Sequence, residues 1–170
     1  MATLPPWDLA VFLQKQEISS DQAHCNSTHD PTIFHVLPDM AEFDEMLLSE
    51  ANKFAFFLET SDSMEWTVRQ ACAVESATKH SGRRVVLLVT APHLVVCSAR
   101  MRRILELPGL LVARINSSLL VSDTPLLPMF TDGRVNNSCC KTVHYSDIYR
   151  LAVLYRLDGH YKLQTVIWVI

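Results

Sequence analysis

Three short apolar segments restrict the fold of this chain more than any other feature. The clearest is Arg84–Thr90, whose sequence Arg-Val-Val-Leu-Leu-Val-Thr is apolar on both faces. Phe54–Leu58 and Leu110–Ile115 are similar in length and character. A strand that is apolar on both faces has to be covered on both sides, which is typical of a parallel sheet packed between helices. We therefore expect these segments to form neighbouring strands of such a sheet.

Segments with helical spacing separate the three predicted strands. Glu65–His80 and Ser98–Leu107 repeat their apolar residues every three or four positions. Each ends at a helix-breaking pair, Ser81-Gly82 or Pro108-Gly109. A strand-helix-strand-helix-strand order predicts an α/β fold with right-handed crossovers, as at the start of a Rossmann-like nucleotide-binding domain. Thr165–Ile170 is nearly all apolar and predicts one more strand.

The chain divides into two parts by its local composition. Prolines and a polar stretch interrupt residues 1–52, which we expect to form a poorly ordered leader or stem. One short amphipathic helix is expected over Met40–Ala51, with Phe43, Met46 and Leu47 on one side. Residues 53–170 are expected to form the folded domain. Because Val166–Ile170 is typical of a covered central strand, we expect the domain to be truncated there.

Composition excludes several classes of protein. Of the 170 residues 49% are hydrophobic and 19% are charged, with a formal net charge of -3. A disordered chain and a nucleic-acid-binding protein are therefore not expected. No apolar run reaches the roughly 20 residues of a membrane-spanning helix, and Met1–Gln16 is not a recognisable signal peptide. Asn-x-Ser/Thr sequons nevertheless occur at Asn26, Asn116 and Asn136.

Common catalytic and metal-binding motifs are absent from the sequence. Its 4 glycines cannot form a glycine-rich phosphate loop. The 5 cysteines show no metal-binding spacing. We expect Cys72 to be a small core residue, and the adjacent Cys139 and Cys140 to be free or separately paired, because a disulfide between neighbours is strained.

A predicted helix beginning at Ser146 carries the most promising polar side chains. Ser146 is a suitable N-cap, and Asp147 and Arg150 are three positions apart on one helix face. Together a carboxylate and a guanidinium can accept and donate hydrogen bonds to the hydroxyls of a sugar. The alternative is an ordinary intrahelical ion pair.

Several ordered segments resemble a known enzyme family. They are Phe56-Phe57-Leu58-Glu59-Thr60-Ser61, Arg69–Ala77, Thr124-Pro125-Leu126, and Ser146-Asp147-Ile148-x-Arg150 followed by Asp158-Gly159-x-Tyr161. Their order and spacing are similar to the N-terminal half of the lactosylceramide 4-alpha-galactosyltransferases and alpha-1,4-N-acetylglucosaminyltransferases. The similar region covers about residues 54–161.

The resemblance implies a fold, a reaction and several site residues. It implies a GT-A glycosyltransferase of the Golgi membrane that transfers galactose or N-acetylglucosamine in alpha-1,4 linkage from a UDP-sugar to a glycolipid or glycan acceptor. The strand end Leu58, Glu59, Thr60 and Ser61 would lie under the nucleotide. Asp147 and Arg150 would hold the donor sugar.

The chain departs from this family where the metal should bind. The resemblance implies manganese held by an Asp-x-Asp pair just after Tyr161, yet the candidate positions are Leu163 and Thr165, or Lys162 and Gln164. We therefore expect no bound metal, and Lys162 is a candidate for neutralising the diphosphate directly. Asp158 also replaces the first glycine of the preceding turn, and a single acid there is a poor manganese ligand set.

These observations leave three hypotheses about function. The first is a glycosyltransferase-family protein whose present chain is incomplete and inactive alone, with no catalytic residue assigned. The second is a non-catalytic, decayed paralogue that at most binds a UDP-sugar. The third is a small cytosolic binding domain unrelated to glycosylation.

Overall fold

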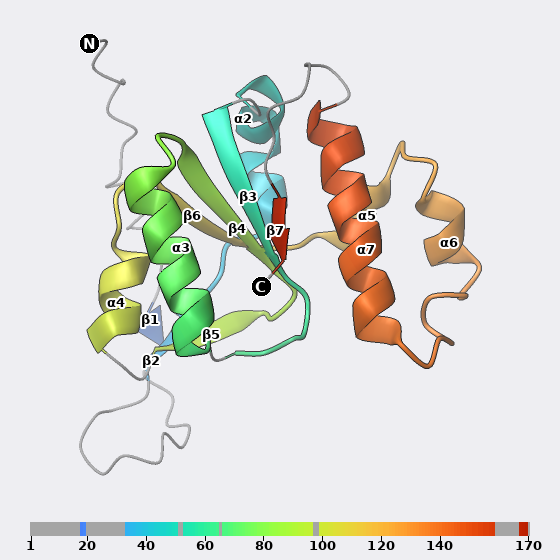
Figure 1. The fold of residues 1–170 in the computed structure, drawn as a ribbon. Helices are drawn as coiled ribbons and strands as arrows, with labels where there is room; N and C mark the ends of the chain where they lie inside the picture. Colours follow the sequence, from blue (N-terminus) through green and yellow to red (C-terminus); the bar gives the residue numbers. More distant parts are fainter. Residues whose placement is uncertain are drawn as a thin grey trace.

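The computed structural model describes residues 18–19, 33–50, 53–64, 66–96, 99–158 and 167–169. Within these ranges the chain is a mixed α/β protein, with one parallel sheet, one small antiparallel sheet and helices around them (Figure 1). The predicted α/β class is therefore confirmed, and the arrangement is compatible with a Rossmann-like fold.

The parallel sheet contains the four predicted strands. They are β3 (Phe54–Glu59), β4 (Arg84–Val89), β6 (Leu110–Arg114) and β7 (Ile167–Val169), in the order β6-β4-β3-β7. All neighbouring pairs are parallel. The chain thus moves outward from β3 to β4 and β6, and then returns to place β7 on the other side of β3. This reversal beside β3 is a topological switch point.

Helices cover both faces of this sheet (Figure 1). On one face α3 (Val68–His80) and α4 (Ala99–Leu105) pack against Phe57 and Leu87. On the other face α5 (Ser117–Val121) and α7 (Lys141–Val153) pack against alternate strand residues such as Phe56 and Leu88. Successive strand residues point to opposite faces, so the doubly apolar strands supply two separate cores.

The expected leader at residues 1–52 is wrong for its C-terminal part. Leu37, Met40 and Leu47 are buried in the two cores. The 3-10 helix η1 (Met40–Phe43) and helix α2 (Asp44–Ser49) replace the single predicted helix over Met40–Ala51. Prolines and polar residues suggested a stem, but an Asp39–Glu42 capping box fixes the entry to η1 and lets apolar side chains turn inward.

A second sheet was not predicted from the sequence. It is antiparallel, with the order β1-β2-β5, and is formed by β1 (Ile18–Ser19), β2 (Ile33–Val36) and β5 (His93–Val96). These strands are only 2, 4 and 4 residues long, too short for a clear alternation of apolar and polar positions.

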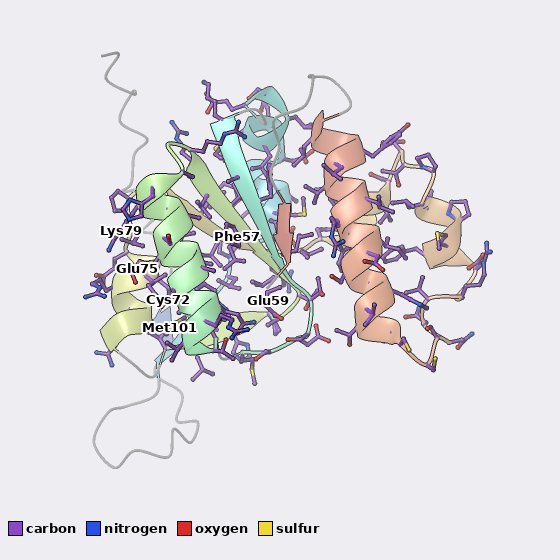
Figure 2. The ribbon with its side chains drawn as sticks, viewed as in Figure 1. Phe57, Glu59, Cys72, Glu75, Lys79 and Met101 are labelled. Carbon is purple, nitrogen blue, oxygen red and sulfur yellow. The ribbon has the colours of Figure 1, made fainter. Side chains whose placement is uncertain are left out.

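Two further expectations need correction. Helix α7 begins at Lys141, so Ser146 is a buried residue within the helix and not its N-cap. Before α7, residues 119–140 hold part of α5 and the short helix α6 (Leu127–Thr131). Cys72 is exposed on α3 (Figure 2) instead of being a core residue, because the neighbouring Ala71 and Val74 face the sheet.

The end of α7 completes the fold. Helix α7 continues directly into the π-helical turn η3 (Leu154–Asp158), which contributes the buried Leu157 to the core.

In the part of the chain that the structure describes, no helix combines the length and the apolar character needed to cross a membrane.

Candidate functional site

Two adjoining pockets lie where the parallel strands end. Pocket A, of about 300 Å³, is lined by Thr60, Asp62, Thr90, Ile115, Ser117, Lys141, Thr142, Tyr145 and Tyr149. Pocket B, of about 260 Å³, is lined by Glu59, Thr60, Ser61, Thr142, Val143, Ser146, Asp147 and Arg150. Thr60 and Thr142 line both pockets, so the two form one groove between the strand ends and α7.

The groove follows from the topology of the sheet. Parallel strands bring their carboxyl ends to one edge, so the residues after β3, β4 and β6 (Thr60, Thr90 and Ile115) meet in pocket A. Helix α7 begins at the same edge, because Lys141 and Thr142 in its first turn line this pocket. Ligands of open α/β sheets bind outside the carboxyl ends of the strands, at the switch point.

Pocket B brings together most of the residues that the sequence singled out. Glu59, Thr60 and Ser61 from the end of β3 face Asp147 and Arg150 from α7 across this pocket. Arg150 Nη2 lies 3.6 Å from Asp147 Oδ1, and the two side chains remain 41% and 56% exposed. An exposed pair of this kind contributes little to stability, so both groups are available to a ligand.

Leu58 and Lys162 differ from the other predicted site residues. The Leu58 side chain is fully buried in the core between the sheet and α7. It can therefore support the nucleotide site from below by packing, but it cannot touch a bound nucleotide. Lys162 lies outside the described residues. For Asp158 the structure describes only the backbone, at the end of η3.

Glu59 is an unusual group at the end of β3 (Figure 2). Its side chain is 1% exposed, and Oε1 accepts hydrogen bonds from the Ser61 amide at 2.9 Å and the Ser61 hydroxyl at 2.5 Å. Oε2 is buried and has no partner among the described residues. A buried carboxylate oxygen without a partner costs free energy.

An aromatic cluster forms one wall of pocket A. The rings of Phe130, Tyr145 and Tyr149 contact one another, with the Tyr145 centroid 5.4 Å from each of the other two and the Phe130 and Tyr149 centroids 5.8 Å apart. The Tyr149 hydroxyl is hydrogen-bonded to the Ser117 hydroxyl at 2.7 Å. Burial raises the pKa of Tyr149 above 10.0, so this phenol stays protonated at neutral pH. The cluster is a fixed surface with an apolar face and a polar rim.

Pocket A also carries charged and hydroxyl groups. Lys141 Nζ lies 5.6 Å from the centre of the Tyr145 ring. Asp62 has a positive φ of 58°, and its amide donates to Thr90 Oγ1 at 3.1 Å, which holds the loop after β3 against the end of β4. Sequence reasoning missed these residues because they come from three separate segments, after β3, after β4 and at the start of α7. The spacing of Tyr145 and Tyr149, one helical turn apart, was the one available signal.

The described residues do not fit a manganese site. No group of three His, Cys, Asp or Glu side chains gathers anywhere in the described part of the chain. The four positions where the acid pair was expected, Lys162 to Thr165, contain no carboxylate. Cys139 and Cys140 are exposed on the loop before α7, with their sulfur atoms 3.3 Å apart. The described residues therefore support no metal-dependent step.

Comparison with known proteins identifies no relative of this chain. No family model, curated protein or solved structure matches the chain.

Proposed function

We propose that the groove binds a nucleotide sugar, UDP-galactose or UDP-N-acetylglucosamine, as the donor-binding part of a GT-A glycosyltransferase. The observation that carries this proposal is the composition of pocket B. Glu59–Ser61 and the Asp147–Arg150 pair, far apart in the sequence, line the same pocket beside the switch point of a parallel sheet.

The chemistry of pocket B suits a hexose. The Asp147 carboxylate accepts hydrogen bonds from hydroxyl groups and the Arg150 guanidinium donates to hydroxyl oxygens. Ser61 and Thr142 add hydroxyls that can do either. A pocket with donors on one side and acceptors beside them distinguishes sugars by the orientation of single hydroxyls.

The chemistry of pocket A suits the nucleoside. Its volume of about 300 Å³ is at the lower end of that of small-molecule sites. Tyr145 offers a ring for stacking on a base, and Asp62 offers acceptors for amide and hydroxyl hydrogens. With the base in pocket A and the hexose in pocket B, the linking diphosphate lies near Thr60 and Thr142.

The transfer step itself would require catalytic groups that the described residues do not supply. The proposed reaction is alpha-1,4 transfer to a glycolipid or glycan acceptor at the Golgi membrane, with this chain supplying the donor site. A second candidate function is nucleotide-sugar binding without transfer. The absence of a carboxylate from Lys162 to Thr165 favours this candidate, since the expected metal would otherwise neutralise the departing diphosphate.

Calorimetric titration with UDP-galactose and with UDP tests the proposal. The wild type should bind UDP-galactose more tightly than UDP. Asp147→Ala and Arg150→Ala should each abolish this preference, a loss of roughly tenfold in affinity for UDP-galactose, because each removes a charge-assisted hydrogen bond. Their affinity for UDP should stay within a factor of about two to three.

A matched control comes from another exposed ion pair. Asp132 and Arg134 are paired on the loop after α6 and line neither pocket. Asp132→Ala should leave both affinities unchanged. Failure of the wild type to bind either ligand would refute the proposed function, and equal binding by all variants would refute the sugar-contacting roles of Asp147 and Arg150.

A further inference from the structure

Two of the three Asn-x-Ser/Thr sequons lie among the described residues, and neither of their acceptor asparagines lines the groove. They are Asn116-Ser117-Ser118, at the start of α5, and Asn136-Asn137-Ser138, on the loop between α6 and α7. The sequon at Asn26 lies outside the described residues. A folded protein can carry an N-linked oligosaccharide only where the asparagine amide reaches solvent. The surroundings of the two asparagines therefore decide which of them can be modified.

The fold uses both ends of the Asn116 amide. Its Oδ1 accepts from the Leu119 amide at 3.0 Å and thereby caps α5. Its Nδ2 donates to Asp39 Oδ2 at 3.4 Å, and Asp39 in turn caps η1. Because an oligosaccharide is attached through Nδ2, a glycan at Asn116 would displace the Asp39 side chain. The folded protein is therefore incompatible with a glycan at this sequon.

The Asn136 amide has the opposite surroundings. The loop between α6 and α7 lies at the outer edge of the molecule (Figure 1), and Asn136 is exposed on it. Its Oδ1 accepts from the Tyr145 hydroxyl at 2.6 Å, whereas its Nδ2 has no partner among the described residues. Glycosylation modifies Nδ2 and keeps Oδ1, so the hydrogen bond to the aromatic wall of pocket A is retained.

The turn that carries Asn136 is held from within the fold. The preceding Val135 is 4% exposed and belongs to the core beneath α7. The Asn137 amide donates to the Gly133 carbonyl at 3.1 Å, and the Ser138 amide donates to the Val135 carbonyl at 3.2 Å. With Val135 fixed inside and the chain turning sharply after it, Asn136 is presented to solvent without any change in the core.

We propose that Asn136 is an N-glycosylation site and that Asn116 is unmodified in the folded protein. This inference rests on the part of the proposed function that places the domain in the Golgi lumen. In the modification, a bond forms between Asn136 Nδ2 and the anomeric carbon of a lipid-linked oligosaccharide. The bond from that carbon to the lipid pyrophosphate breaks, and Nδ2 gives up one proton. Since Asn136 lines neither pocket, the glycan leaves donor binding unchanged.

Expression of the full chain behind a cleavable secretion signal tests this inference. An Asn26→Gln background removes the sequon outside the described residues. The secreted protein should carry one N-linked glycan, which an N-glycosidase removes while converting Asn136 to aspartate in the peptide map. Ser138→Ala should abolish the glycan and the matched Ser118→Ala should keep it, although each change removes the hydroxyl of one sequon. Asn136→Gln should behave like Ser138→Ala.

The inference and the proposed function can fail separately. A secreted protein without a glycan, or with a glycan at Asn116, would overturn the inference. UDP-galactose titration of the secreted protein before and after N-glycosidase digestion should give equal affinities. Failure of both forms to bind UDP-galactose would refute the donor site and leave the glycan assignment standing.

Discussion

Among single residues, those that line the groove differ in how far their type reveals their role. Asp147 and Arg150 attract notice in the sequence because opposite charges at helical spacing can hold a sugar. Glu59 becomes informative only in three dimensions, because burial of its carboxylate and the missing partner of Oε2 depend on the whole fold. The neighbouring Leu58, which was also predicted to belong to the site, packs in the core.

Asp39 is a single residue whose charge should matter to stability. It caps η1, and its carboxylate contacts Arg114 at 3.0 Å and Asn116 at 3.4 Å. Burial alone would raise the pKa of Asp39, but the hydrogen bonds from the Ala41 amide, Arg114 and Asn116 outweigh it and hold the pKa below 3.8. A lowered folded-state pKa means that this stabilisation is present above the unfolded pKa and lost as pH falls through the folded pKa.

Asp39→Ala should therefore lower the free energy of unfolding by about 1–2 kcal/mol at pH 7, through loss of the cap and the ion pair. Asp39→Asn keeps a capping oxygen and should lose less. The difference between wild type and Asp39→Asn should shrink as pH falls below 3.8, because the carboxyl is protonated first in the unfolded state and then, at lower pH, in the folded state. Urea denaturation at pH 7 and pH 3 measures these differences, and a gap between the two proteins that is equal at both pH values would contradict the assignment.

Among the helices and strands, the long periodic segments were predictable and the short ones were not. The predicted strand at Arg84–Thr90 corresponds to β4, and the predicted helix at Glu65–His80 corresponds to α3. Strand β5 was missed because it pairs with the distant β2 and has no period of its own. The start of α7 was misplaced because Ser146 is a typical N-cap residue, whereas tertiary packing of Tyr145 extends the helix backwards.

Ser146→Ala tests where α7 begins. Ser146 is buried within the helix, so alanine, a better helix former, should change the free energy of unfolding by less than about 0.5 kcal/mol. Thr67→Ala is the matched comparison, because Thr67 is the N-cap of α3 and accepts from the Gln70 amide at 3.2 Å. It should cost about 1 kcal/mol. Equal losses in the two variants would mean that α7 begins at Ser146 after all.

Taken together, the strands and helices form a domain whose switch point decides where a ligand can bind. A parallel sheet that contains β3, β4 and β6 followed from the sequence pattern, but the order of the strands and the return of the chain to place β7 beside β3 did not. The site, too, was predictable only in part. The charged pair and the strand end were predictable, whereas pocket A depends on the meeting of three strand ends with α7.

Val86→Asp tests the central position of β4. Val86 is fully buried and pairs with Phe56 on one side and Leu111 on the other. An unpaired buried carboxylate there should cost more than about 4 kcal/mol and unfold the domain. Val68→Asp makes the same change at the exposed start of α3, where an acid favours the helix dipole, and should leave the melting temperature unchanged or slightly raised. An unaltered melting curve for Val86→Asp would refute the strand assignment.

The most direct test of the central claim is an NMR titration of the isotope-labelled chain with UDP-galactose. We predict saturable amide shifts that concentrate at Glu59–Ser61 and at Lys141–Arg150, because these segments face each other across the groove. Amides on α3, on the opposite face of the sheet, should not move. Shifts that are absent, or that gather on α3 and leave the groove unchanged, would contradict the proposal that this groove binds a nucleotide sugar.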